Sequence, residues 1–214
     1  MVEDLAEKAS SVPPERGFDP GGLEKADRRL VRATRAFDDV RKAGNWAEFE
    51  PAWSDFLLAS NAVFSIIEQA AKSSSKGPPW FGRYKKERKD DPLLSYMHHA
   101  RNSDEHGIEP VAQDLPWMAG PVPESGKLVS LSFSDGKPTG AVVKGQSGEE
   151  FSLTIAPPRP NLIRVFDRRY GDSFDPPNLH LGKPIEPGNP YSAGEALLAY
   201  LEAMVASARA FPRT

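Results

Sequence analysis

The chain contains no cysteine, which excludes a disulfide framework and a zinc site built on thiolates. This absence fits a reducing compartment, and we predict a cytoplasmic protein. Long hydrophobic runs are also missing. The most apolar stretch, 56–67, is shorter than the ~20 residues of a membrane-spanning helix and contains Ser60, Asn61 and Ser65. We therefore expect a buried helix there and no membrane partner. The acidic N-terminus shows no signal-peptide core.

Several signatures of common enzymes are absent as well. The sequence has no Walker loop, no G-x-G-x-x-G and no G-x-S-x-G, so a conventional nucleotide-binding or hydrolase fold is not indicated. Its net charge of −3 argues against a protein that coats nucleic acid, although an enzyme needs only a few local charges. His180 follows Asp172 and Asp175, but no metal-ligand spacing supports a site there. No cofactor is predicted.

Proline is abundant and unevenly distributed. The 21 prolines crowd the stretches 12–20, 76–92, 110–123 and 157–190, so long helices must lie between these stretches. A length of 214 residues permits one large domain or one domain with a sizeable insertion.

Two long helices are predicted in the first third of the chain. Apolar residues spaced by three and four predict a helix over 23–42, and Gly44 is a natural stop. The aromatic-rich segment 45–72 predicts a second helix, which begins either with Asn45 as its cap or at Pro51. The short turn between the two helices implies that they are antiparallel neighbours.

Two further helices carry clear terminal signals. After a loop over 73–79, Asp91-Pro92 is typical of an N-cap followed by proline, and we expect a helix from Pro92 to about His106. Gly107 would end it. Near the C-terminus, Ser192 and Glu195 have the spacing of a capping box before an apolar stripe, which predicts the last helix.

The segment between these helices has β character. Residues 108–126 are Pro-rich and predicted to be irregular. We expect strands over 127–133, 141–144 and 150–155, a turn at 134–136, and either a strand or a short helix over 161–166.

Together these elements predict a mainly α protein. The expected fold is an up-and-down helical bundle of about four helices, with a small antiparallel β insertion before the C-terminal helix. Residues 1–22 would be a loose leader, 23–107 and 191–211 the bundle, and 108–190 the Pro-rich and β insertion.

The helix predicted over 92–106 holds most of the histidine in the chain. Its histidines are His98, His99 and His106, out of 4 in total. Because seven residues make almost two helical turns, positions 99, 102, 103 and 106 are predicted to form one polar stripe, with Arg101 beside it.

Arg101-Asn102-x-x-x-His106 resembles the R-N-x-x-x-H motif of the HEPN family (higher eukaryotes and prokaryotes nucleotide-binding). The resemblance covers roughly 23–107 and implies a four- or five-helix bundle whose motif faces a groove between two subunits of a homodimer. Many members of that family are metal-independent endoribonucleases, often of toxin–antitoxin or defence systems, where an antitoxin or other protein is a partner. Others are non-catalytic dimerisation or binding modules.

The motif residues suit RNA cleavage without a metal. Histidine titrates near neutral pH, so His106 could move the proton of a ribose 2′-OH or of the leaving 5′-oxygen. Arg101 offers forked donors to phosphate oxygens, and Asn102 could bind phosphate or orient His106. The products would be a 2′,3′-cyclic phosphate and a 5′-hydroxyl. In the plainer interpretation, Arg101 forms surface ion pairs with Asp104 or Glu105, and His106 favours the helix dipole.

Additional residues are candidates for RNA binding. They are His99 on the motif helix, Arg83, Lys85 and Lys86 in the basic segment, and Arg28 and Arg32 on the first helix. Solvated helix faces would explain the same charges. Trp80, Phe81 and Tyr84 would either stack on bases or tether a loop to the core.

Three functional hypotheses follow. The first is a HEPN-like homodimer that acts on RNA as a metal-independent endoribonuclease, and the second is a non-catalytic HEPN-like module that dimerises or binds a partner. The third is an unrelated helical scaffold with a coincidental motif.

Overall fold

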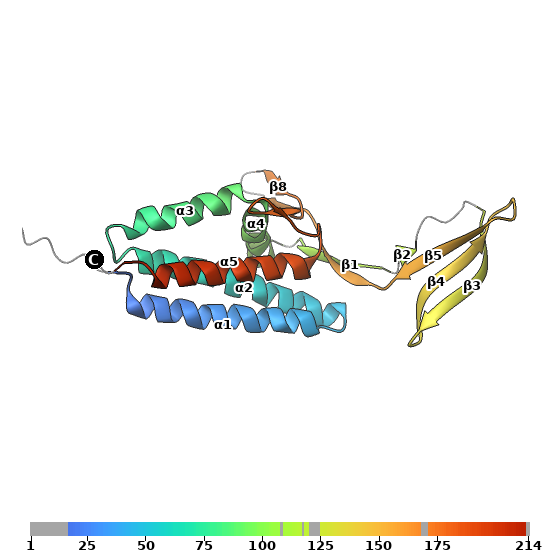
Figure 1. Ribbon diagram of the computed structural model, residues 1–214, viewed down its shortest axis with the longest axis horizontal. Coiled ribbons are helices and arrows are strands. Elements are labelled where there is room, and N and C mark those ends of the chain that lie inside the picture. Colours follow the sequence, from blue (N-terminus) through green and yellow to red (C-terminus); the bar gives the residue numbers. More distant parts are fainter. Residues whose placement is uncertain (1–16, 108, 117, 120–124, 168–170, 213–214) are drawn as a thin grey trace, which may run out of the picture.

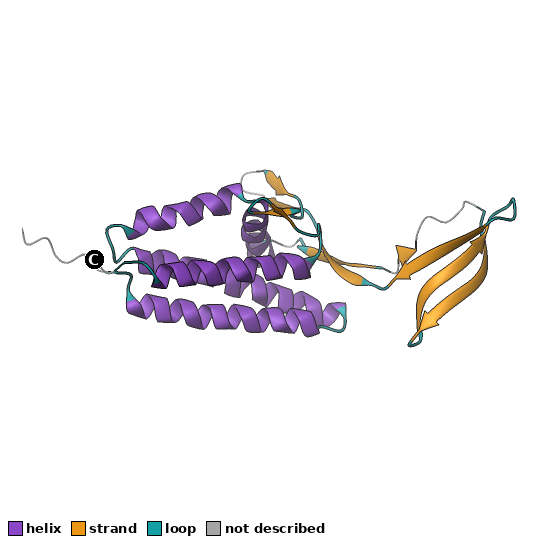
Figure 2. Cartoon of the chain, viewed as in Figure 1, coloured by secondary structure: helices purple, strands orange, loops and turns teal. Residues whose placement is uncertain are grey.

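The computed structural model describes residues 17–107, 109–116, 118–119, 125–167 and 171–212. Within them the chain forms five helices and several small antiparallel sheets (Figures 1 and 2). The helices are α1 (Pro20–Lys42), α2 (Trp46–Ala71), α3 (Gly77–Asp90), α4 (Pro92–His106) and α5 (Pro190–Arg209).

Helices α1, α2 and α5 run side by side, and α3 lies across the body from α1 (Figure 1). The Asn45 side chain caps α2 by accepting the Glu48 N–H at 3.0 Å, and Pro51 lies within the helix. Of the two predicted starts, Asn45 is therefore correct. The core between these helices is rich in large side chains that are almost fully buried, among them Phe37, Trp53, Phe56, Leu201 and Met204.

The predicted leader over 1–22 is wrong at its C-terminal end, and residues 1–16 lie outside the described part. Helix α1 begins at Pro20 because Asp19 accepts the Gly22 N–H at 2.7 Å. Phe18, only 4% exposed, stacks on Phe211 with ring centroids 4.3 Å apart. This aromatic contact ties the start of the described chain to its end.

Helix α3 is an element that the sequence analysis did not predict. The expected loop over 73–79 ends early, because Pro78 and Pro79 occupy the first helical turn, where a missing N–H costs nothing. Phe81 and Tyr84 are buried, at 2% and 5% exposure. They anchor α3 to the core, so stacking of these two rings on RNA bases is excluded.

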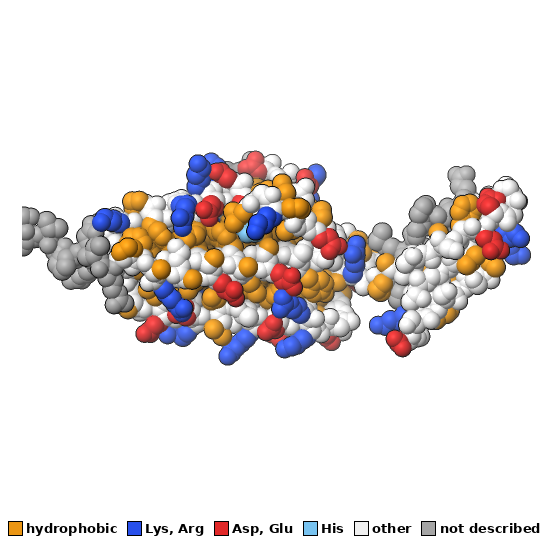
Figure 3. Space-filling model, viewed as in Figure 1, with side chains coloured by type: hydrophobic (Ala, Val, Ile, Leu, Met, Phe, Trp, Pro, Cys, Tyr) orange, Lys and Arg blue, Asp and Glu red, His pale blue; other side chains and the backbone are white. Residues whose placement is uncertain are grey.

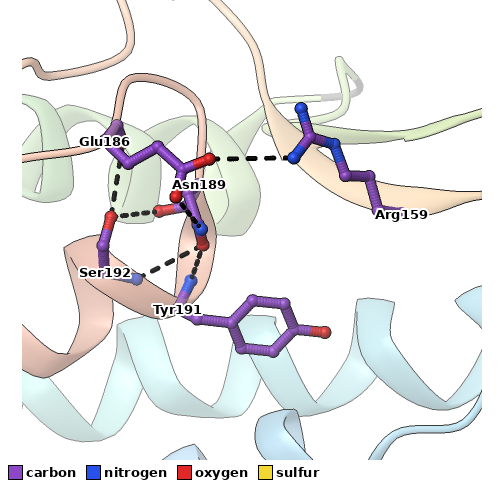
Figure 4. A network of polar contacts seen from close by, with 5 residues as sticks. All are labelled: Arg159, Glu186, Asn189, Tyr191 and Ser192. Atoms are coloured by element: carbon purple, nitrogen blue, oxygen red, sulfur yellow. Dashed lines mark hydrogen bonds and ion pairs between the residues drawn. The ribbon is translucent and has the colours of Figure 1, made fainter. Parts of the chain in front are cut away.

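Helix α5 begins earlier than its predicted capping box (Figure 4). Asn189 is the N-cap, and its Oδ1 accepts the Tyr191 N–H at 2.8 Å. Ser192 Oγ donates to backbone carbonyls upstream, at residues 186 and 189. Glu195 pairs instead with Arg41 of α1 at 2.9 Å. The Ser192–Glu195 box was wrong because Asn189-Pro190 supplies a complete cap on its own.

The β region is not one small insertion, which corrects the predicted architecture. Its long arm contains β1 (Ala112–Leu115), β2 (Met118–Ala119), β3 (Lys127–Ser134), β4 (Lys137–Lys144), β5 (Glu150–Ala156) and β6 (Arg159–Leu162). Two hairpins, β7 (Val165–Asp167) with β8 (Asp172–Phe174) and β9 (Leu179–His180) with β10 (Lys183–Pro184), pack on the helical body. Residues 161–166 thus contain the end of β6, a two-residue link and the start of β7, and form no helix.

The arm projects away from the helices (Figures 1 and 2). The β1–β6 ribbon leads to a four-stranded antiparallel sheet of order β2-β5-β4-β3. The predicted turn at 134–136 is confirmed: Asp135 and Gly136 both have positive φ, 50° and 74°, as a two-residue hairpin turn requires.

The root of the arm is fixed to α4 and α5. The buried Tyr96 hydroxyl of α4 donates to the Ile163 carbonyl at 2.7 Å and lies 3.2 Å from the Val111 carbonyl. It therefore contacts both the segment that enters the arm and the segment that leaves it. On the other side, Arg159 of β6 lies 3.7 Å from Glu186, next to the α5 cap (Figure 4).

Candidate functional site

The candidate site lies on α4, whose predicted bounds are confirmed. Asp91 caps the helix by accepting the Leu94 N–H at 3.0 Å, and Gly107 follows its last residue. Leu93 and Ala100 are fully buried, with 0% exposure. The helix packs on α2, α3 and the β7–β8 hairpin, so its polar residues lie where three parts of the molecule meet.

Arg101 and Asn102 form a hydrogen-bonded pair on the C-terminal half of α4. Arg101 Nη1 donates to Asn102 Oδ1 at 3.1 Å, and both side chains are half-buried. The other terminal nitrogen of Arg101 pairs with Glu105 one turn later, the surface ion pair of the plainer interpretation. His106 ends the helix, but its side chain lies outside the described part of the structure. The joint action of Arg101 and His106 stays a prediction.

His98, not His99, is the histidine next to this pair. Asn102 Nδ2 lies 3.5 Å from His98 Nε2. Burial, together with the positive charges of Arg88 and Arg101, lowers the pKa of His98 to about 4. His98 is therefore neutral near pH 7, with one ring nitrogen as donor and one as acceptor.

His99 points the other way, towards the β7–β8 hairpin. Its ring stacks on Phe174 with centroids 3.7 Å apart, and its Nδ1 lies 3.3 Å from Asp167 Oδ2. Burial lowers the pKa of His99, while the Asp167 carboxylate opposes that shift. Of two residues on the predicted stripe, Asn102 therefore contacts His98, and His99 contacts the β7–β8 hairpin. Positions 98 and 102 are also one helical turn apart, so helix geometry alone allows either histidine to neighbour Asn102. The stack of His99 on Phe174 directs His99 to the hairpin and leaves His98 beside Asn102.

A pocket of about 380 Å³, counted to its open mouth, lies beside His98 between α2, α4 and α5. Its lining is mostly apolar, with four polar residues: Ser60, Asn61, Arg88 and His98. Ser60 Oγ and His98 Nδ1 are buried and have no hydrogen-bond partner among the described residues. Two residues of the pocket lining thus each carry a buried polar atom whose hydrogen bond is unmet.

Arg88 is the residue of this site that the sequence analysis missed. Its guanidinium carbon lies 4.4 Å from the Phe64 ring centroid, and burial lowers the pKa of its side chain. The segment Arg83–Lys89 gave the only signal. Without α3 as a helix, nothing distinguished Arg88 from its exposed neighbours.

The predicted RNA-binding cations of α3 are divided between two faces. Lys85 pairs with Glu68 of α2 at 2.5 Å. Arg83 donates to the Tyr84 hydroxyl at 2.8 Å, and it lines a groove together with Lys86. That groove reaches α4 at Pro92, and nine residues of helix, or ~14 Å, separate Pro92 from Arg101.

The predicted cations of α1 lie elsewhere. Arg28 and Arg32 are exposed, and Arg28 lies 3.7 Å from Glu24. Helix α1 packs on α2 and α5, across the body from α3 (Figure 1). The structure therefore does not gather these arginines with Arg101. On the face shown in Figure 3, acidic and basic side chains are interspersed over the helical body.

His180 has a partner that the sequence did not suggest. Its Nδ1 lies 3.0 Å from Asp91 Oδ1, the same carboxylate that caps α4. In the part of the chain that the structure describes, no group of three or more histidine, aspartate or glutamate side chains could hold a metal ion. None of the described helices is both long and apolar enough to cross a bilayer.

Comparisons with known proteins give no relative of this chain from which a function could be proposed. No protein-family model matches the chain, and no curated protein or solved structure matches it either.

Proposed function

We propose that this chain is a HEPN-like protein that acts on RNA, with Arg101, Asn102 and His106 as a metal-independent endoribonuclease site. The observation that carries the proposal is the Arg101–Asn102 pair, hydrogen-bonded at 3.1 Å and partly exposed near the C-terminal end of α4. Position 106 follows Asn102 by about one turn on the same helix, so it belongs to the same region of its surface.

The arrangement supports phosphate recognition. Arg101 is held by Asn102 on one side and by Glu105 on the other, which pre-orients its planar guanidinium. In this mechanism the guanidinium binds the scissile phosphate and offsets the charge that develops on it. The Asn102 amide retains its Nδ2 donor for a phosphate oxygen or for His98.

Proton transfer is assigned to His106. A second copy of the chain would supply the second histidine, so that one removes the 2′-OH proton and the other protonates the leaving 5′-oxygen. His98 is unsuited to the role of a cationic acid, because its pKa of about 4 keeps it neutral at physiological pH. Its place is beside Asn102, where a neutral ring can accept a hydrogen bond and orient the amide.

Cleavage of labelled single-stranded RNA in EDTA tests the proposal. We expect the wild-type chain to leave 2′,3′-cyclic phosphate ends. Arg101→Ala and His106→Ala should each lower the cleavage rate by at least ~100-fold, since each removes a charge or a proton carrier from the transition state.

Arg209→Ala is the matched control, because Arg209 is an exposed arginine on α5 that pairs with Asp27, and its loss should leave the rate unchanged. Glu105→Gln removes the charge that neutralises Arg101, and we expect a several-fold lower KM for RNA. If the His106→Ala protein keeps its helical circular dichroism and still cleaves at the wild-type rate, the assignment is wrong.

A second candidate function is a non-catalytic HEPN-like module that binds a protein partner. The Arg101–Glu105 ion pair favours it, because it gives the motif arginine an ionic partner without any ligand. The arm also favours it, since it carries large apolar side chains away from the core. RNA that stays intact, under conditions in which a partner protein binds, would select this function over the first.

A further inference from the structure

The sheet of the arm has one apolar face. Register places Leu131 opposite Ala141, and Ala141 opposite Leu153, so these three side chains lie on the same side. The same face continues along each strand to Leu128, Phe133, Val143 and Phe151. The reverse face carries mainly small polar residues, among them Ser130, Ser132, Ser152 and Thr154.

Strand β3 leaves much of its apolar surface in solvent. Leu128 is 53% exposed, Leu131 45% and Phe133 61%, and every residue of the strand is exposed. Isolated surface leucines are ordinary, but these lie on one strand and one face. Such a contiguous row indicates a contact surface.

The backbone of β3 is also open to pairing. It is the outermost strand of its sheet, and no described residue pairs with its outer edge. Its eight residues contain no proline, and Lys127 at the start is the only charge. Soluble proteins usually protect an edge of this length with charge, proline or β-bulges, or cover it. The pairing of β3 with β4 shifts register at two places, but no proline and no internal charge blocks the outer edge of β3.

We propose that β3 pairs antiparallel with β3 of a second copy of this chain, joining two arms into one continuous sheet. A two-fold axis at Leu131 keeps the apolar faces of both copies on the same side. It sets the two Leu131 side chains opposite each other across the new seam, with each Phe133 diagonal to them, where apolar and aromatic pairs stabilise a sheet.

The charges at the ends of β3 fit this arrangement. The strand begins at Lys127, and the turn beyond its other end carries Asp135. Antiparallel pairing about the two-fold brings Lys127 of one copy beside Asp135 of the other, at both ends of the seam. A parallel arrangement would set Lys127 against Lys127. The sequence of β3 is therefore complementary to itself in the antiparallel direction only.

The contact should be reversible. An eight-residue strand is ~26 Å long, and pairing at one edge buries less than the ~1,600 Å² of a standard interface. We expect a dissociation constant in the range of about 1–100 µM. The proposal does not rest on the RNA function, and this seam is distinct from the groove between two subunits that the HEPN resemblance implies beside the motif.

Sedimentation velocity of the full chain over about 1–200 µM tests the proposal. We expect the wild-type chain to form a concentration-dependent dimer. The double variant Leu131→Lys/Phe133→Lys should have a dimer dissociation constant at least tenfold higher, and should therefore be mainly monomeric over this range. The matched control is Phe166→Lys, because Phe166 is 50% exposed on β7 of the body; it should dimerise like the wild type.

Charge variants test the register of the seam. They also test the proposal independently, in case the double variant misfolds. Lys127→Glu should weaken the dimer by placing like charges together, and adding Asp135→Asn, which suits the positive φ of that turn, should restore part of the loss. A wild-type chain that is monomeric throughout, or a Leu131→Lys/Phe133→Lys dimer as strong as the wild type, overturns the proposal. Neither result depends on whether RNA is cleaved.

Discussion

Asp91 and His180, 89 positions apart in the chain, meet at the start of α4, where Asp91 Oδ1 lies 3.0 Å from His180 Nδ1. The same carboxylate accepts the N–H groups of Leu94 at 3.0 Å and Leu181 at 2.6 Å. One buried side chain thus caps the motif helix and also holds the turn between β9 and β10. The sequence predicted that Asp91 caps α4, but it did not predict the contact of Asp91 with the β9–β10 turn.

Asp91→Ala should destabilise the fold by about 2–4 kcal/mol, because it removes a helix cap and leaves two further donors without their acceptor. Chemical denaturation followed by circular dichroism measures the change. Asp90→Ala, at the exposed neighbouring position, should change stability by less than about 0.5 kcal/mol. Equal losses in the two variants would show that the Asp91 contacts add nothing.

Two glycine-to-alanine changes in helices should have opposite signs. A methyl group at Gly194 of α5 would lie 2.1 Å from Phe37 Cε2, so Gly194→Ala must push α1 and α5 apart. We expect a loss of about 1–3 kcal/mol. At Gly82 of α3 a methyl group meets nothing within 4 Å, and Gly82→Ala should add about 0.5–1 kcal/mol through helix propensity.

Thermal unfolding of both variants measures the difference, and wild-type protein is the reference. A neutral Gly194→Ala variant would contradict the close approach of α5 to Phe37 described here.

Stability should fall in mild acid because of His98. In the unfolded chain this histidine takes up a proton below about pH 6.5, whereas its folded pKa of about 4 keeps it neutral. The unfolded state therefore binds more protons between these values, so the stabilisation is complete above pH 6.5 and declines towards pH 4. His98→Gln should reduce the loss between pH 7 and 5 by about 1 kcal/mol, allowing for partial exposure.

Urea unfolding at pH 7 and pH 5 provides the measurement. His99→Gln is the internal control: the Asp167 carboxylate counteracts the burial of His99, so its replacement should alter the pH dependence less. A His98→Gln protein with the same pH dependence as the wild type would mean that His98 is not kept neutral by its surroundings.

Local sequence was sufficient where a signal acts over one turn. Asp91-Pro92 and Gly107 defined both ends of α4, and Asp135-Gly136 defined a hairpin turn, because capping and positive φ depend on neighbouring residues alone. The same reasoning failed at Pro78-Pro79, where two prolines start a helix instead of breaking one. The difference lies in Phe81 and Tyr84, which stabilise α3 by packing against residues that are remote in the sequence.

The composition of α4 and the spacing of its polar residues were therefore properties of the sequence itself, and so were the apolar face of β3 and its single charge at Lys127. Only the tertiary structure decided that His98 contacts Asn102 while His99 stacks on Phe174, and that Arg88 lies half-buried beside a pocket. Those outcomes depend on which side chains pack against each face of α3 and α4 and exclude water from it. Such neighbours come from residues far apart in the chain, and no local pattern encodes them.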